Sequence, residues 1–179
     1  SRVAPHNLYT SGELMEKLVK AKGWPRHYSY SPWAFKDDAS LSQRGNIKEV
    51  RINFSSSPYL VVYRYRKEEN VFERYQAGLP HKDEDGSVIK VKNVVLAYYS
   101  GYQYRSNSHV LWHFYTEQGG RVKVLRDGKV IEGIWMRNGG RTRFFDESGK
   151  EIKFNRGNTW VEVIAPSVSV SIYQSEEET

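Results

Sequence analysis

Apolar and polar residues alternate along most of the chain after residue 46, which is the pattern of half-buried β-strands. In the clearest run, Val50, Ile52 and Phe54 alternate with Arg51 and Asn53. Further strands are predicted at 59–66, 71–76, 88–91, 93–99, 108–115, 121–125, 129–135, 141–145, 151–154 and 158–164. Turn residues separate these runs at intervals of about 8–12 residues, as in sandwiches, barrels and meanders. The segments 88–91 and 93–99 form either one interrupted strand or two short strands.

Three hairpins are predicted from the residues between neighbouring strands. Lys67-Glu-Glu-Asn70 joins the first pair, and Asp127-Gly128 is a strong short-range hairpin signal. Asp146-Glu-Ser-Gly149 joins the third pair. The fold class is therefore mainly β (α+β): an antiparallel β meander, sandwich or partly open barrel with one N-terminal helix.

The N-terminal helix is predicted from apolar residues at helical spacing. Leu14, Leu18 and Ala21 form one stripe, and a Thr-Ser pair before it supplies a cap. Gly23 and Pro25 end the helix.

The spacing of apolar residues changes from helical to alternating near residue 46, and with the acidic end this divides the chain into three segments. Residues 1–46 are expected to hold the helix and a connecting segment, and residues 47–166 the β-rich domain. Residues 167–179 end in an acidic run and are expected to form a partly disordered tail.

The composition limits the classes of binding partner and the reactive groups that the protein can have. The formal charge is +6 and the pI about 9.4, which favours anionic partners such as nucleic acid, acidic cell-wall polymers or lipid headgroups. The chain has no Cys, which excludes disulfides, a thiolate nucleophile and thiolate metal sites. No apolar run approaches the roughly 20 residues that span a bilayer.

The densest collection of reactive groups lies at Gly78-Leu-Pro-His-Lys-Asp-Glu-Asp-Gly86. On an extended segment His81, Asp83 and Asp85 share a face, which suits proton transfer by His81 and Asp83 or binding by Asp85. The position that a calcium loop fills with a bidentate Glu is a lysine here, so this is not an EF-hand. Asn93 is positioned to brace the loop through its amide. The alternative is a solvated turn whose Asp side chains bond their own backbone.

His6 and Asn7 form a second candidate site before the helix, whose N-terminus favours a nearby anion. The alternative is that they satisfy backbone groups at a joint between domains. Convergence of His6 with His81, Asp83 and Asn93 would indicate a real site, because turn chemistry does not bring distant residues together.

Basic and aromatic residues alternate in two stretches, which suggests a surface for single-stranded nucleic acid or sugars. The candidate ligand-binding residues are Arg64, Arg66, Tyr102 and Arg105. The alternative is that alternating Tyr and Arg are ordinary strand residues with one face buried.

No metal site and no cofactor are predicted. His109 and His113 have the spacing of a metal pair on a helix, but their segment is predicted as a strand, which separates them by about 13 Å. In that strand Val110, Trp112 and Phe114 are expected to point into the core. Phosphate-loop, dinucleotide and nucleophile-elbow motifs are absent from the sequence.

Five runs in order carry a family resemblance: Ala4-Pro-His-Asn-Leu-Tyr-Thr-Ser11, Gly78-Leu-Pro-His-Lys-Asp83, Lys92-Asn-Val-Val95, Asp127-Gly-Lys-Val-Ile-Glu-Gly-Ile-Trp135 and Asn155-Arg-Gly-Asn-Thr-Trp-Val-Glu-Val163. Together they resemble the bacterial YerB-like family of lipoproteins, a domain of unknown function. The resemblance runs from about residue 1 to 166. It implies a fragment, with the end of an N-terminal domain followed by a β-rich C-terminal domain. It also implies an extracytoplasmic location, anchored by lipid in the full-length protein, and brings no established activity.

Three functions remain open from the sequence. The first is a non-enzymatic extracytoplasmic binding or assembly module whose partner is an anionic polymer, a protein or the missing N-terminal half. The second is an enzyme acting on a cell-envelope polymer, with His81 and Asp83 as its acid–base pair. The third is a single-stranded nucleic-acid-binding protein that uses the basic and aromatic strands.

Overall fold

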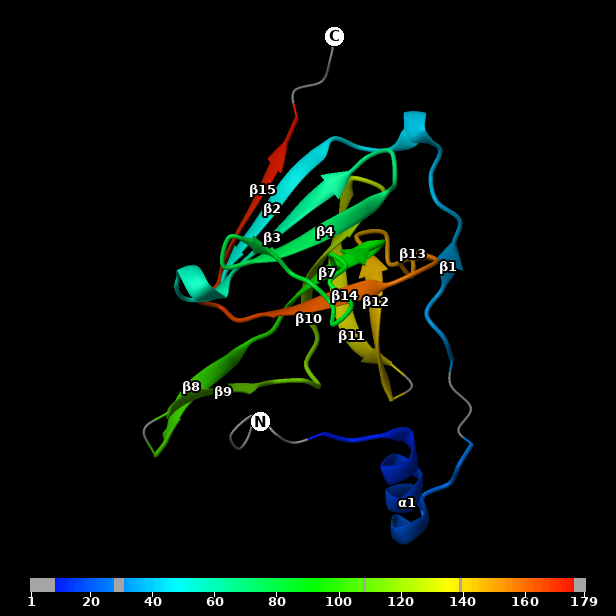
Figure 1. Ribbon diagram of the computed structural model, residues 1–179, viewed down its shortest axis with the longest axis vertical. Coiled ribbons are helices and arrows are strands. Elements are labelled where there is room, and N and C mark those ends of the chain that lie inside the picture. Colours follow the sequence, from blue (N-terminus) through cyan, green and yellow to red (C-terminus); the bar gives the residue numbers. More distant parts are fainter. Residues whose placement is uncertain (1–8, 28–30, 108, 139, 176–179) are drawn as a thin grey trace. The chain divides into compact units, whose positions relative to one another are not determined.

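The computed structural model describes residues 9–27, 31–107, 109–138 and 140–175, and the chain forms two compact units, Ser1–Pro32 and Trp33–Thr179 (Figure 1). The first unit contains α1 (Gly12–Lys22), as predicted. Ser11 caps α1 by accepting a hydrogen bond from the Leu14 amide at 3.3 Å, and Gly23 ends it. None of the described helices is long and apolar enough to cross a bilayer.

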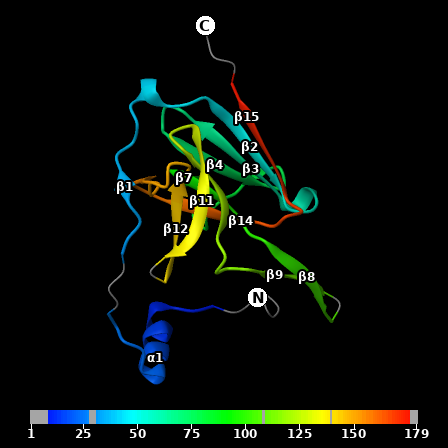
Figure 2. The same cartoon turned by 180° about the vertical axis from the view of Figure 1, so that it is seen from behind.

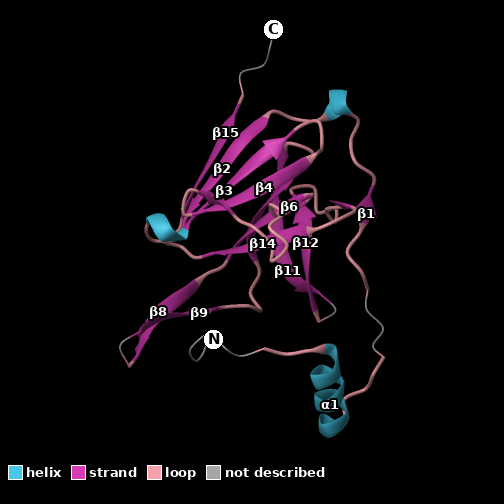
Figure 3. Ribbon diagram, viewed as in Figure 1, coloured by secondary structure: helices cyan, strands magenta, loops and turns pink. Residues whose placement is uncertain are grey.

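The second unit is built from strands (Figure 3). Its larger sheet has the order β15-β2-β3-β4-β5, and β6 also pairs with β4. The strands of this sheet, in the order of the chain, are β2 (Ile47–Asn53), β3 (Leu60–Arg66), β4 (Val71–Gln76), β5 (Leu79–Pro80), β6 (Lys90–Val91) and β15 (Ser169–Gln174). All of its pairings are antiparallel.

A five-stranded sheet has the order β12-β11-β10-β7-β14. Its strands are β7 (Asn93–Tyr98), β10 (Gly120–Arg126), β11 (Lys129–Asn138), β12 (Arg141–Asp146) and β14 (Thr159–Ile164). β14 runs parallel to β7, and the other pairings are antiparallel. Figure 2 shows this sheet from the side opposite to Figure 1, with β11 and β12 in front.

Two small sheets complete the second unit. β1 (Phe35–Lys36) pairs with β13 (Phe154–Asn155), and β8 (Gly101–Ser106) pairs with β9 (His109–Phe114). Two short 3-10 helices, η1 (Leu41–Gln43) and η2 (Ser57–Tyr59), lie in the connections. The mainly antiparallel β fold with one N-terminal helix is therefore confirmed, and its sheets do not close into a barrel.

The two large sheets share one apolar core, which makes the body of the second unit a sandwich. The six-stranded sheet contributes residues such as Val50, Ile52 and Phe72, and the five-stranded sheet contributes Leu96 and Ile164. Each of these five side chains is fully buried. The alternation seen in the sequence thus points one face of each sheet toward the other.

A second core covers the opposite face of the five-stranded sheet. Trp135 and Phe144 of that sheet pack with Phe154, and the Trp33 ring lies over Phe144 and Phe154 at 5.5 and 5.1 Å between centroids. The segment around β1 therefore belongs to the β unit, although the sequence placed residues up to 46 with the helix.

Other differences from the predicted elements have tertiary causes. Within the segment expected to be a partly disordered tail, residues 169–174 form β15 at the edge of the six-stranded sheet, where Val170 and Ile172 pack on its core. The segment expected as a strand at 151–154 pairs with β12 only at its start, where Glu151 bridges Phe145 and the Ile152 amide donates to the Phe144 carbonyl at 2.8 Å. The pairing goes no further because Phe154 pairs with β1. The interrupted segment at 88–99 proves to be two strands, β6 and β7, in different sheets.

Candidate functional site

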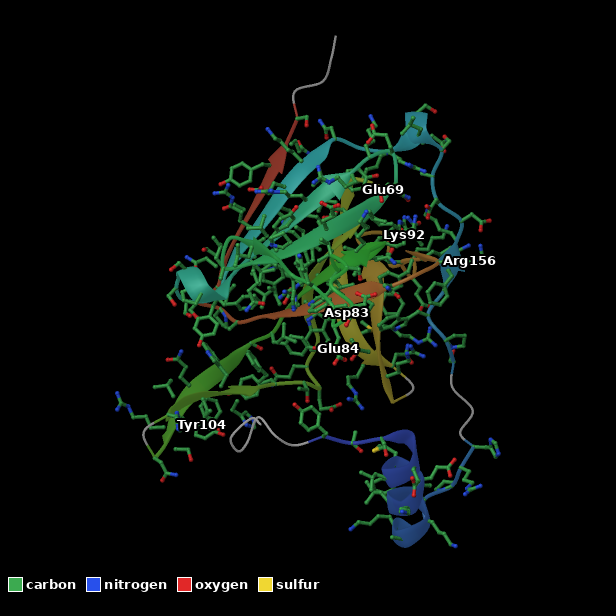
Figure 4. All side chains as sticks on the ribbon, viewed as in Figure 1. Glu69, Asp83, Glu84, Lys92, Tyr104 and Arg156 are labelled. Carbon is green, nitrogen blue, oxygen red and sulfur yellow. The ribbon has the colours of Figure 1, made fainter. Side chains whose placement is uncertain are left out.

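The loop at residues 78–86 ends in a tight turn that its own carboxylates hold closed (Figure 4). The Glu84 amide donates to Asp83 Oδ1 at 2.7 Å, and the Ser87 amide donates to Asp85 Oδ1 at 2.8 Å. Hydrogen bonds from Ser87 lower the pKa of Asp85 below its ordinary value. The Asp side chains therefore hydrogen-bond to the backbone of their own turn, which is the solvated-turn alternative that the sequence left open.

His81 lies at the start of this loop and faces β4. The Arg74 guanidinium approaches His81 Nδ1 at 2.5 Å, and the His81 backbone amide donates to the Arg74 carbonyl at 2.9 Å. Because a guanidinium only donates, Nδ1 must be the acceptor and the ring is neutral. Burial, and then the charge of Arg74, lower the pKa of His81. No hydrogen bond joins His81 to Asp83 in the described structure, so the geometry does not favour the predicted acid–base pair.

Arg74 links His81 to a buried network between the two sheets. Tyr63 donates its hydroxyl hydrogen bond to Glu162 Oε1 at 2.6 Å, and Arg74 Nε lies 3.2 Å from the same hydroxyl and 3.6 Å from Glu162. The guanidinium also lies over the Trp160 ring, 4.4 Å from its centroid. Burial, and then Glu162, raise the pKa of Tyr63. With Arg74 and Glu162 each less than a tenth exposed, this network joins the layers rather than presenting groups to a ligand.

Asn93 is fully buried and braces a different segment from the one predicted. Its Nδ2 donates to the Asn155 carbonyl at 2.9 Å and to Thr159 Oγ1 at 3.0 Å, and its Oδ1 accepts from the Asn155 amide. These three hydrogen bonds fix the chain from β13 into the start of β14. Asn93 therefore does not join His81 and Asp83, and the convergence that would have indicated a real site is not found at Asn93.

Asp127 anchors a second buried polar cluster. Its carboxylate accepts hydrogen bonds from Asn70 at 2.8 Å and Asn155 at 2.6 Å, and pairs with Lys36 at 2.7 Å. Although burial raises its pKa, the hydrogen bonds from Lys36, Asn155 and Asn70 hold the pKa of Asp127 well below its usual range. This cluster ties the segment after β1 to the turn between β10 and β11.

Arg64 and Arg66 lie on the outer face of the six-stranded sheet, and both are paired. Arg64 contacts Glu49 at 3.1 Å and stacks over Tyr75 at 4.4 Å, while Arg66 contacts Glu73 at 2.7 Å. These contacts match the ordinary-strand alternative, and they leave no run of unpaired cations along this face.

Tyr102 and Arg105 lie elsewhere, on the two-stranded sheet of β8 and β9, called here the aromatic hairpin (residues 101–114). Figures 1 and 2 show it extending from the body of the second unit. Tyr102 stacks on His113 at 5.0 Å, and Arg105 falls on the opposite face by the alternation of the strand. The candidate nucleic-acid residues are thus divided between two separate sheets.

The aromatic hairpin is attached to the body through its base. Phe114 contacts Tyr99 at 6.0 Å, and Tyr99 stacks on the buried Trp135 at 4.0 Å. Beyond this base the expected packing of Val110 and Trp112 into the core is wrong: Val110 is 54% exposed, and Trp112 stacks only on Phe114. None of the described residues of β8 and β9 is buried.

A groove of about 340 Å³ lies beside the five-stranded sheet. The cations on its wall are already engaged, since Lys123 pairs with Glu132 at 2.8 Å and Arg121 lies over the Tyr98 ring at 4.9 Å. With Asp146 and Glu147 also on the wall, the groove has three acidic side chains against two basic ones, so it offers no basic surface to an anionic partner.

His6 and Asn7 lie outside the described residues. Among the described residues no three His, Asp or Glu side chains are grouped so that they could hold a metal ion. Sequence reasoning missed the buried groups Arg74, Glu162 and Asp127. The signal available for the first two was a charged residue at an inward position of an alternating strand.

Comparisons with known proteins place the chain in a family. It is 26% identical over 179 residues to the Bacillus subtilis (strain 168) protein named "Putative lipoprotein YerB", covering 96% of this chain and 52% of that protein. The crystal structure of YerB from Bacillus subtilis matches the fold with a TM-score of 0.75 at 25% identity, over 95% of this chain and 57% of that one. The chain therefore spans about half the length of its relative. Residues 50–161 match the C-terminal domain of the protein of unknown function DUF3048, and since this is more than half of the chain, the protein belongs to the DUF3048 family through that domain.

Proposed function

We propose that this protein is a non-enzymatic binding or assembly module of a bacterial envelope lipoprotein, and that the aromatic hairpin is its binding surface. The extracytoplasmic setting is supported by the name of the Bacillus relative. The choice of surface is supported by the exposure of the hairpin.

The observation that carries the proposal is the amount of apolar surface on the hairpin. Tyr102, Tyr104 and Leu111, which share one face of the hairpin, are each between 41% and 50% exposed, and Figure 4 labels Tyr104 on this hairpin. Soluble monomers rarely expose contiguous apolar patches of this kind without a use for them. A two-stranded hairpin is also marginally stable by itself. A partner that covers one face would bury the aromatic side chains and hold the two strands in place.

The chemistry of the hairpin favours a protein partner. Tyrosine, tryptophan and phenylalanine beside aliphatic side chains are typical of the buried centre of protein interfaces. In the described structure β8 and β9 pair only with each other, so each offers a free backbone edge to an added strand. Residues 101–114 contain Arg105 and two histidines but no Asp or Glu. The expected partner surface is therefore apolar with an acidic margin.

The other two functions have weaker support. An enzyme using His81 would need the Nδ1 lone pair that already faces Arg74, and the Asp83 carboxylate that already holds its turn. Nucleic-acid binding would need Arg64 and Arg66 to give up Glu49 and Glu73.

The proposal is tested with a photo-crosslinking amino acid placed at Tyr104 of the full-length protein in its native envelope. Tyr59 in η2 is the matched control position, because it is an exposed tyrosine at 59% on another part of the same unit. We expect a discrete protein adduct at position 104 that exceeds the adduct at 59 by about tenfold, which corresponds to about 1.4 kcal/mol of specific binding.

The double substitution Tyr102→Ala with Leu111→Ala should remove that adduct, because both side chains share the face of Tyr104. Equal labelling at positions 59 and 104 would contradict the proposal. So would retention of a purified envelope polymer that depends on Tyr102 and Leu111 in the absence of any protein adduct.

A further inference from the structure

The helix α1 carries an apolar stripe whose side chains are exposed in the described part of its unit. Leu14 is 52% exposed, Met15 47% and Leu18 39%, and none of the residues of α1 is buried. The opposite side of α1 is charged, with Glu13 and Lys17 paired at 2.7 Å. The helix is therefore amphipathic, with the apolar side exposed.

A helix of this kind needs a surface to pack on. Isolated helices shorter than about 12–15 residues are marginal in water, and most helix stability in proteins comes from burial of an apolar face. α1 has 11 residues, a Ser11 cap and a Gly23 end, so its two ends are specified while its packing is not. The missing stabilisation is the burial of Leu14, Met15 and Leu18.

We propose that this stripe docks on the domain that precedes the DUF3048 C-terminal domain in longer family members, so that α1 is the last element of that domain. Three observations place α1 on the N-terminal side of the boundary. The match to the C-terminal domain begins at residue 50, α1 lies in a unit that ends at Pro32, and the chain covers 52% of the length of its Bacillus relative.

Two other occupants fit the stripe less well. A membrane-surface helix has a strongly basic polar face, whereas in α1 Glu13 and Glu16 offset two of the three lysines and leave an excess of only one positive charge. A second copy of α1 would offer only about 16 Å of helix on each side, since each residue adds about 1.5 Å. Such a contact buries far less than the roughly 1,600 Å² of a standard interface. Docking within one chain needs less area, because the linker keeps the local concentration of the partner high.

The test uses hydrogen exchange of the α1 amides in two lengths of the protein, this chain and a longer chain that carries the domain preceding it in longer family members. We expect fast exchange in this chain and slowing of at least about tenfold in the longer one, as for a helix held by tertiary packing. The double substitution Leu14→Gln with Leu18→Gln should abolish the slowing, and it leaves helix propensity nearly unchanged.

The matched control is Glu16→Gln with Lys20→Gln, on the polar side of the same helix. It should keep the slow exchange of the longer chain. Equal exchange in both lengths, or equal effects of the two double variants, would overturn the proposal. A concentration-dependent slowing in this chain, or binding to anionic phospholipid vesicles that is lost in the leucine variant, would also overturn it in favour of a second copy or a lipid surface. The aromatic hairpin takes no part in this test, so the outcome is independent of the proposed function.

Discussion

At the scale of single residues, burial separates two arginines that are otherwise alike. Arg74 and Arg64 each pair with a glutamate, and each lies 4.4 Å from the centroid of an aromatic ring. The side chain of Arg74 is 6% exposed and that of Arg64 is 49% exposed. Solvent therefore screens one pair and not the other.

This contrast predicts different costs for the same substitution. Arg74→Met should lower the free energy of unfolding by about 3 kcal/mol, because it leaves the carboxylate of Glu162 buried without its cation. Arg64→Met should cost about 1 kcal/mol or less, since Glu49 stays partly solvated and keeps Arg51 as a partner. Urea unfolding of both variants measures the difference.

The methionine keeps most of the apolar stem in each case, so lost packing is similar in the two variants. Equal costs would show that the network around Glu162 does not depend on its charge. A large loss for Arg64→Met alone would mean that the outer face of the sheet, and not the sandwich interior, carries the electrostatic stabilisation.

At the scale of elements, the turn between β10 and β11 does more than join two strands. Asp127 and Gly128 both have positive φ, at 52° and 66°, as a two-residue type I′ turn requires. The same turn carries the Asp127 carboxylate into the buried cluster and packs Gly128 beneath the Tyr65 ring. A local turn signal in the sequence thus marks a tertiary junction.

Gly128→Ala is therefore expected to be costly. A Cβ at this position would clash with the Tyr65 ring and lie 2.8 Å from the Gly45 carbonyl oxygen. The loss should be about 3 kcal/mol, from backbone strain and overpacking together. Thermal unfolding of the variant measures it.

Gly149→Ala is the matched control, because Gly149 also lies in a hairpin turn with positive φ, at 80°, and a Cβ there would meet nothing within 4 Å. This substitution should lower the free energy of unfolding by about 1 kcal/mol, from backbone strain alone. If the two variants lose the same stability, the close approach of Gly128 to Tyr65 is not maintained in solution.

At the scale of the whole molecule, the chain is a β sandwich unit joined to a separate helical unit. The sandwich has two apolar cores of its own, one on each face of the five-stranded sheet. Neither core contains a residue from the described part of the helical unit. The two units should therefore be independent in stability.

Removal of residues 1–32 tests this independence. The midpoint of thermal unfolding and the near-ultraviolet circular dichroism of the β unit should be unchanged, with a difference in stability within about 0.5 kcal/mol, as for surface changes. A clear fall in the midpoint would mean that the segment before Trp33 stabilises the sandwich.

Local signals sufficed for much of the fold and for little of the candidate site. Alternation, turn residues and a capped apolar stripe predicted α1, β2 and the hairpins of β3–β4 and β10–β11. The predicted loop at 78–86 exists as a turn, but its carboxylates are used locally and His81 faces Arg74. The sequence spacing of the reactive residues did not reveal the contact of His81, because Arg74, the cation that keeps the ring neutral, lies on another strand.

The sequence by itself determined the class of fold, the position of the helix and most of the strands, because these depend on periodicity and on turn chemistry within a few residues. Only the tertiary structure decided which faces are covered. It buried Arg74 and Glu162 between the layers, placed the end of the chain in β15, and left the hairpin of β8 and β9 exposed on both faces. Strand alternation shows that two faces differ, but coverage of a face depends on segments far away in sequence. The sequence therefore named residues of both proposed binding surfaces, whereas their exposure was decided only by folding.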